Sequence, residues 1–274
     1  MDIVNIAAYK FVDLPEGALP ELRDQLLADC ERRELLGTIL LSSEGINLIL
    51  AGAAEKIGGF KKMLSRMAPF QDMEYKESSS SYPPFKRMWV KIKKEIITMN
   101  RKEIRPATFT GPRITAQELK RWLDEGREFT LLDTRNDYEV RLGSFAQAED
   151  LHIASFRQFP EAVKQMPPEA RDKPLVMFCT GGIRCEKASP LLLQQGFREV
   201  YQLEGGILKY FEAVGDAHFR GECFVFDQRV GLNGKLQETG AALCEFCSAP
   251  LTVAEQQAHD YRPGQPCPYC PAPF

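Results

Sequence analysis

One segment limits what this chain can fold into more than any other, namely the alternation of short apolar runs and helical patterns between residues 115 and 203. The expected elements are buried strands at 129–132, 175–178 and 200–203 and helices at 115–125 and 185–195. Thr115 and Glu118 have the spacing of a capping box at the start of the first helix. Strands that alternate with helices form a parallel sheet covered on both faces, so we expect an α/β domain here.

The strand at 175–178 is followed by the strongest catalytic signal in the chain, the loop Cys179-Thr180-Gly181-Gly182-Ile183-Arg184. Active sites of parallel sheets lie at the carboxyl ends of strands. The two glycines allow a tight turn with inward N–H groups, the following helix adds the positive end of its dipole, and Arg184 adds a cation. These features predict a nucleophilic cysteine with a lowered pKa. The alternative is that Cys179 is only a buried structural cysteine, but the Gly-Gly-x-Arg sequence after it would then have no explanation.

Three further features lie in or beside this loop. Cys179 and Arg184 are separated by four residues, one fewer than in the loop of cysteine-dependent phosphatases, and this tighter loop suits a single sulfur or oxygen atom bound to Cys179. Cys185 either resolves an oxidised or persulfidated Cys179 as a disulfide or packs as an ordinary helix residue. Asp133 and Arg135 follow another strand and are catalytic candidates that either brace the loop or form a structural ion pair.

The first 105 residues predict a different unit. The expected elements are strands at 3–11, 37–41, 46–50 and 88–92, a further candidate strand at 73–76, and helices at 15–33 and 54–67. The order βαββαβ indicates a ferredoxin-like unit. The polar, proline-containing segment 78–84 is expected to be a loop.

A basic run lies at the end of this unit, although the formal net charge of the chain is −3. Residues 86–105 hold eight basic and two acidic residues, with Trp89 inside the run and Tyr82 beside it. Basic side chains neutralise phosphates and aromatic faces stack on unpaired bases, so the run is a candidate RNA-binding surface. Its candidate residues are Lys86, Arg87, Lys91, Lys93 and Lys94. The alternative is a strand edge that lysines keep solvated.

The last segment, 221–274, is poor in aliphatic residues and contains two C-x2-C pairs. Cys244 and Cys247 are separated from Cys267 and Cys270 by 19 residues, which is the spacing of a structural zinc site. A metal would supply folding energy to a segment with little core. The alternative is four reduced surface thiols.

The chain is therefore expected to divide into 1–105, 106–220 and 221–274, with a linker at 105–112. No apolar stretch approaches the length of a membrane span, and the start Met1-Asp2-Ile3-Val4-Asn5 lacks the basic region of a signal peptide. We expect a cytoplasmic protein without a membrane partner, whose eight cysteines are reduced thiols or metal ligands.

Several motifs also resemble known families. Asp133-Thr134-Arg135, the Cys179 loop and Glu204-Gly205-Gly206-Ile207 resemble a rhodanese domain over about 111–215. The ordered series 43–47, 91–96, 179–187 and 221–227 resembles the bacterial tRNA uridine hydroxylase family over essentially the whole chain. That resemblance implies an acylphosphatase-like N-terminal domain, a rhodanese domain and a cysteine-bearing tail. It also implies oxygen-dependent formation of 5-hydroxyuridine at the wobble position of tRNA, with O2 as co-substrate.

The resemblance leaves the mechanism open. The Cys179 thiolate could add to C6 of uracil, or the cysteine could carry a persulfide, as the loop cysteine of rhodaneses does. The electron donor is not identified by any motif, and a reductant or sulfur-donor protein is a candidate partner. Glu44 and Asn47 are either polar groups near the substrate or part of a turn between strands.

Two alternative functions remain. A sulfurtransferase would move sulfur from a persulfide, but Thr180 stands where sulfurtransferase loops usually have Arg or Lys. A non-catalytic RNA- or protein-binding module would not need Cys179 and Arg184.

Overall fold

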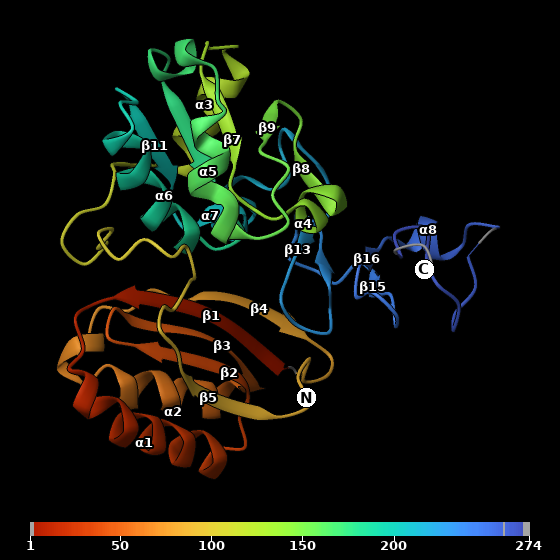
Figure 1. Ribbon diagram of the computed structural model, residues 1–274. Helices are drawn as coiled ribbons and strands as arrows, with labels where there is room; N and C mark the ends of the chain where they lie inside the picture. Colours follow the sequence, from red (N-terminus) through yellow and green to blue (C-terminus); the bar gives the residue numbers. More distant parts are fainter. Residues whose placement is uncertain (1–2, 260, 271–274) are drawn as a thin grey trace.

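Two sheets, each with its own helices, lie one above the other in the computed structural model, which describes residues 3–259 and 261–270 (Figure 1). The first lobe holds one five-stranded sheet in the order β4-β1-β3-β2-β5. Its strands are β1 (Ile3–Phe11), β2 (Leu36–Ser42), β3 (Gly45–Ala53), β4 (Lys76–Ser80) and β5 (Met88–Ile92). The first four pair antiparallel, as a ferredoxin-like unit does, and β5 adds a parallel strand beside β2. The predicted fold of this part is confirmed.

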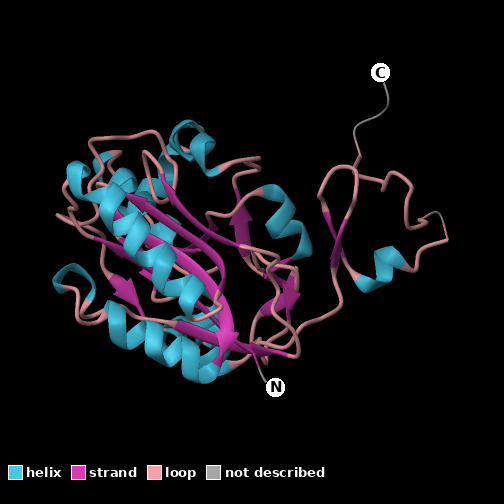
Figure 2. Cartoon of the chain, turned by 90° about the horizontal axis from the view of Figure 1, so that it is seen from below, coloured by secondary structure: helices cyan, strands magenta, loops and turns pink. Residues whose placement is uncertain are grey.

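Helices cover only one face of this sheet. They are α1 (Leu19–Arg32) and α2 (Ala54–Leu64), which face the viewer in Figure 2. Strand residues alternate between the two faces, so Ile6 and Ala8 are buried against the helices whereas Asn5, Ala7 and Tyr9 point to the other side. This uncovered face, here called the open face, is turned toward the second lobe.

One prediction in this lobe is wrong. Ser78 to Ser80 do not form a loop, and the strand expected at 73–76 runs instead from Lys76 to Ser80. This edge strand pairs with β1 through backbone groups. In addition, Asn5 Nδ2 donates to Ser80 Oγ at 2.9 Å. Because this edge strand is polar throughout, its sequence lacks the alternation of apolar and polar residues that predicts a strand.

The second lobe contains the predicted parallel sheet, in the order β6-β11-β10-β7-β9. Its strands are β6 (Arg113–Ile114), β7 (Thr130–Asp133), β9 (Ala148–Asp150), β10 (Leu175–Phe178) and β11 (Val200–Leu203), and every neighbouring pair is parallel. The helices are α3 (Ala116–Asp124) and α7 (Gly206–Val214) on one face and α5 (Phe159–Lys164) and α6 (Ile183–Gln194) on the other. The doubly covered α/β fold is confirmed.

The capping box predicted for the first helix of this lobe is only half formed. Thr115 Oγ1 accepts from the backbone N–H of Glu118 at 3.2 Å. The Glu118 carboxylate does not return to the N-cap, because it accepts from Trp122 Nε1 at 2.7 Å and pairs with Arg121.

The remaining elements are short. They are α4 (Asp137–Leu142), β8 (Gly143–Phe145), β12 (Phe219–Gly221), β13 (Cys223–Phe224), β14 (Gly231–Leu232), β15 (Ala242–Leu243), β16 (Pro250–Leu251) and α8 (Val253–Gln256). The last three belong to a cysteine-rich tail that stands apart from both lobes (Figures 1 and 2). Arg141 of α4 holds it, with Nη2 2.7 Å from the Pro250 carbonyl oxygen and the guanidinium 3.3 Å from the Tyr269 ring centre.

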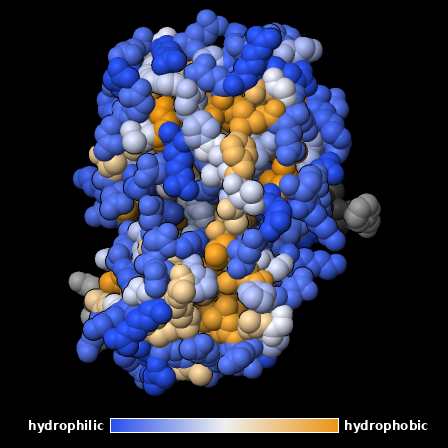
Figure 3. Space-filling model, turned by 90° about the vertical axis from the view of Figure 1, so that its left-hand side faces the viewer, coloured by the Kyte–Doolittle hydropathy of each residue, from blue (hydrophilic) through white to orange (hydrophobic). Residues whose placement is uncertain are grey.

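The division of the chain at residues 105 and 220 stays a prediction. The surface seen in Figure 3 is mostly hydrophilic, with hydrophobic patches set among polar residues. No helix in the described ranges is long and apolar enough to cross a membrane.

Candidate active site

A cavity of about 610 Å³ lies between the two lobes and is here called the interlobe cavity. Residues of the open face, including Asn5, Tyr9 and Asn47, form one wall. The Cys179 loop forms a second wall. The third is the strap, defined as residues 225–229, which passes from the second lobe back to the first: Arg229 donates to Ser78 Oγ at 2.7 Å and Gln228 N to the Pro84 carbonyl at 3.0 Å. Three parts of the chain therefore enclose one site.

Cys179 lies at the end of the central strand β10, is buried, and lines this cavity. Gly182 has φ +97°, a conformation that favours glycine, and this turn directs its N–H to Cys179 Sγ at 3.1 Å. Burial opposes ionisation of the thiol. It is outweighed by a hydrogen bond from Cys185, the charge of Arg184 and backbone N–H groups, which together lower the pKa of Cys179 to about 5. The predicted thiolate cradle is thus present in its geometry.

The start of α7 holds this loop from behind. The backbone N–H groups of Ile207 and Leu208 donate to the carbonyls of Cys179 and Thr180, at 2.9 and 3.1 Å. Gly206 has φ +67°, and a Cβ there would lie 2.4 Å from the Cys179 carbonyl oxygen. The motif at 204–207 therefore has a physical role, which is to let a helix start against the loop backbone.

Arg184 makes a two-pronged ion pair with Glu139 of α4, which was not predicted. Nη1 and Nη2 of Arg184 lie 2.6 and 2.7 Å from the two carboxylate oxygens, and both side chains are buried. Asn136 and Glu139 have capping-box spacing, and one half of the box forms, with Asn136 N donating to Glu139 Oε1 at 3.2 Å, so the sequence did hold a signal for α4. It held none for the contact with Arg184, 45 residues further on.

The other predicted loop neighbours lie behind the cavity wall. Asp133 and Arg135 form a fully buried ion pair at 2.6 Å, and neither lines the cavity. Arg135 also donates to the Gly143 carbonyl, also at 2.6 Å. Cys185 is fully buried and 3.8 Å from Thr134 Oγ1, and burial together with the neighbouring Cys179 raises its pKa well above the ordinary value. Asp133 and Arg135 thus bond to each other and to β8, and no hydrogen bond of the described residues joins either side chain to the Cys179 loop.

A second buried ion cluster joins the two lobes. Lys187 of α6 is 1% exposed, and its Nζ lies 2.8 Å from Glu44 and 2.7 Å from Glu95. Glu44 also accepts from the Ile96 backbone N–H at 2.7 Å, so it fixes the lobes rather than facing the cavity. Asn47 does line the cavity, and its amide donates to the Ile96 carbonyl at 3.1 Å.

The predicted RNA-binding residues lie on and around β5. Lys86, Arg87, Lys91, Lys93 and Lys94 are all exposed, and Lys93 also lines the cavity. Trp89 is 45% exposed, with Lys91 Nζ 4.7 Å from its ring centre. It pairs in register with Thr38, whose side chain is on the open face, so Trp89 continues the cavity wall outward.

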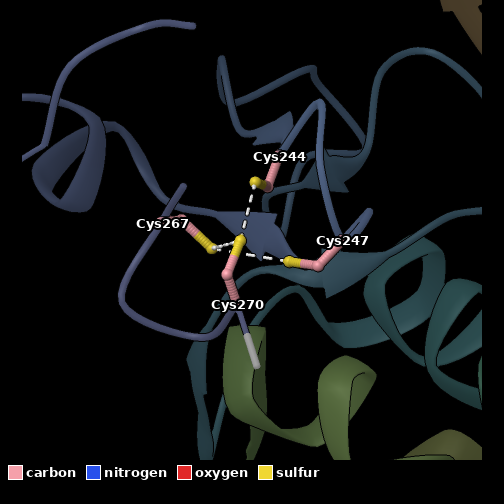
Figure 4. A group of neighbouring side chains, drawn as sticks. All are labelled: Cys244, Cys247, Cys267 and Cys270. Atoms are coloured by element: carbon pink, nitrogen blue, oxygen red, sulfur yellow. Dashed lines mark hydrogen bonds between the residues drawn. The ribbon is translucent and has the colours of Figure 1, made fainter. Parts of the chain in front are cut away.

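The four tail cysteines come together as predicted, with their thiols directed toward one another (Figure 4). Their sulfurs are 3.7 Å apart for Cys244 and Cys270, 3.5 Å for Cys247 and Cys267, and 3.8 Å for Cys270 and Cys267. Disulfide sulfurs would lie about 2 Å apart. A tetrahedron with Zn–S bonds of about 2.3 Å has edges of about 3.8 Å. The cluster therefore has the dimensions of a metal site.

The fold and the loop define the class of this protein: a rhodanese-type domain, with its cysteine at the end of the central parallel strand, facing an acylphosphatase-like lobe. Family models agree, since residues 3–96 match the UPF0176 acylphosphatase like domain and residues 115–213 match the Rhodanese-like domain. The rhodanese-like domain of an Anabaena protein, solved by NMR, is 25% identical, covers 40% of this chain and 79% of that one, and has a TM-score of 0.34.

Full-length relatives narrow the class further. The tRNA uridine(34) hydroxylase of Cupriavidus necator is 51% identical over 98% of this chain and 97% of its own length. The proteins of that name from Ralstonia nicotianae and Burkholderia vietnamiensis are 50% and 47% identical, each over 98% of this chain and 97% or 98% of their own. The chain belongs to the tRNA uridine(34) hydroxylase family.

Proposed function

We propose that this protein hydroxylates C5 of the wobble uridine of tRNA to give 5-hydroxyuridine. The observation that carries the proposal is the Cys179 thiolate cradle inside the interlobe cavity, in a chain that shares about half its residues with tRNA uridine(34) hydroxylases. The cavity volume lies within the range of small-molecule sites, roughly 300–1,000 Å³. An extruded base would enter it, as in other enzymes that act on bases.

The chemistry assigned to Cys179 starts from its thiolate. Sγ adds to C6 of uracil, and the electron pair of the C5–C6 bond moves onto C5, C4 and O4. One oxygen atom of O2 becomes the C5 hydroxyl and the other becomes water, with two electrons and two protons from a reductant outside the chain. Loss of the C5 proton and of Sγ then restores the ring. Thr180, Gly181, Gly182 and Ile183 shape the loop, while Arg184 and the loop amides stabilise the developing negative charge.

The other predicted residues are given supporting roles. Lys86, Arg87, Lys91, Lys93 and Lys94 bind tRNA phosphates, and Trp89 stacks on an unpaired base. Asp133 and Arg135 support the loop from behind. Cys244, Cys247, Cys267 and Cys270 hold a structural zinc ion as thiolates, which stabilises a tail with little core of its own.

The test is nucleoside mass spectrometry of unmodified tRNA incubated aerobically with the protein and a thiol reductant. We expect 5-hydroxyuridine with the native protein and none with Cys179→Ser, while tRNA binding is retained. The matched control is Cys30→Ala, because Cys30 is buried in the first lobe away from the cavity. Hydroxylation by Cys179→Ser would exclude the assigned role. Formation of 2-thiouridine would identify a sulfurtransferase instead.

A further inference from the structure

Buried cations in this protein are almost always matched with carboxylates. The pairs are Arg135 with Asp133, Arg184 with Glu139, Lys187 with Glu44 and Glu95, and Arg229 with Asp227. Lys76 is different. Its side chain has no ion pair and no hydrogen bond among the described residues, although it is partly buried in the cavity wall.

Lys76 lines the same cavity as Cys179, from the opposite lobe. It is the first residue of β4, and its Nζ lies 4.6 Å from the centre of the Tyr9 ring. Tyr9 in turn touches the Cys179 loop: its hydroxyl would be 2.9 Å from a Cβ on Gly182, and it donates to Glu186 at 3.0 Å. The ammonium therefore lies over an aromatic ring that contacts the loop.

The other charges of the cavity wall show how Lys76 differs from its neighbours. Burial lowers the pKa of Lys76, and the negative charges of Glu74, Cys179 and Glu186 act in the opposite direction. Arg184 shares its positive charge with Glu139, to which both of its Nη groups donate. Two further cations of the wall, Lys93 and Arg157, are exposed to solvent, which screens them. Lys76 is thus a partly buried cation of the wall that forms no ion pair with a described carboxylate.

We propose that Lys76 is a catalytic residue whose ammonium binds an anionic oxygen of the substrate beside Cys179. The identity of the substrate as a nucleotide rests on the proposed function above. The oxygen belongs either to a phosphate of the bound nucleotide or to uracil O4, where negative charge develops after addition at C6. A partly buried ammonium without an ion pair is a good partner for either oxygen, because less water competes for it than at the surface.

The first test needs no tRNA. Cys179 is alkylated with iodoacetate, which is anionic, or with iodoacetamide, which is neutral and of similar size, and the rate is measured on the Cys179 peptide by mass spectrometry. We expect Lys76→Met to lower the iodoacetate-to-iodoacetamide rate ratio at least fivefold. Lys76→Arg is expected to keep the ratio. Lys62→Met is the control, because Lys62 is exposed on α2.

An unchanged ratio in Lys76→Met would overturn the proposal, whether or not the protein hydroxylates tRNA. Lys76→Gln is measured in parallel, so that a folding defect of one variant does not decide the result. The iodoacetamide rate of each variant shows whether the thiolate itself is intact.

The second test separates the two oxygens. If Lys76 holds a phosphate, Lys76→Met weakens tRNA binding and reduces the slope of log Kd against log salt by about one. If it holds O4, the affinity for tRNA stays the same and the single-turnover rate falls by about 10²–10³. A variant with native affinity and native rate would overturn the proposal.

Discussion

Arg184 and Glu139 form a two-pronged ion pair, with two N–H···O bonds of 2.6 and 2.7 Å between buried groups. This geometry fixes the plane of the guanidinium and holds Arg184 beside Cys179. It also makes the pair nearly neutral, so the loop can bury an arginine without an uncompensated charge.

Glu139→Gln is expected to lower the free energy of unfolding by about 3–5 kcal/mol, because breaking a buried pair leaves the remaining charge without its partner. The measurement is urea unfolding at neutral pH. Glu128→Gln is the control, since Glu128 pairs with Lys173 on the exposed surface and its loss should leave the unfolding midpoint unchanged. Equal midpoints for both variants and the native protein would show that the pair does not hold the loop.

Cys185→Ala is expected to raise the pKa of Cys179 from about 5, because it removes a hydrogen bond that favours the thiolate. The pH dependence of Cys179 alkylation by iodoacetamide measures this pKa, since only the thiolate reacts and its fraction grows as pH rises. The half-maximal pH should move upward in Cys185→Ala and stay in place in Cys30→Ala. No movement in Cys185→Ala would exclude this hydrogen bond.

The same shift makes stability depend on pH. The folded-state pKa of Cys179 is below its ordinary value of 9.0, so ionisation favours the folded state. This contribution is fully present above pH 9 and is lost as pH falls toward 5. Cys179→Ser should therefore show a weaker rise in the free energy of unfolding between pH 5 and 9 than the native protein.

Gly206→Ala and Gly126→Ala form a matched pair. Both glycines have positive φ, +67° and +62°, so alanine costs about 1–2 kcal/mol of backbone strain at either position. Only Gly206 also faces the carbonyls of Cys179 and Thr180, at 2.4 and 2.7 Å from an added Cβ. We expect Gly206→Ala to abolish the fast alkylation of Cys179 and Gly126→Ala to preserve it. Fast alkylation in both variants would show that the start of α7 does not shape the loop.

Cys270→Ser is expected to reduce bound zinc from one ion per chain to a fraction of that value, measured by elemental mass spectrometry after gel filtration. A tetrahedral site needs all four thiolates for tight binding. Cys223→Ser serves as the control, because Cys223 is buried in the second lobe away from the cluster. A native protein that binds no zinc after purification under reducing conditions would contradict the assignment.

Replacing Lys91, Lys93 and Lys94 with glutamate should weaken tRNA binding and flatten its salt dependence, because fewer phosphates are then neutralised. Filter binding at several salt concentrations measures both effects. The control replaces Arg121, Lys164 and Lys173, which are equally exposed on the second lobe and do not line the cavity. Equal loss in both triple variants would indicate binding by overall charge alone.

Local signals explain what the sequence predicted well. The strands at 175–178 and 200–203 have the bounds expected for them: the first is the continuous apolar run Leu-Val-Met-Phe, and the second is a short run bounded by Glu199 and Glu204. Contacts between distant segments explain what was missed. Nothing near Lys76 or Tyr9 indicates that a strand of one lobe will face the loop of another, and Glu139 meets Arg184 only after the sheet has formed.

The strap is the last wall of the interlobe cavity in sequence order. All strands of the two five-stranded sheets lie before residue 225 in the sequence. The strap adds the third wall of the cavity and is tied to the first lobe where Arg229 donates to Ser78. A chain cut short before residue 225 would therefore keep both sheets and lack one wall of the cavity.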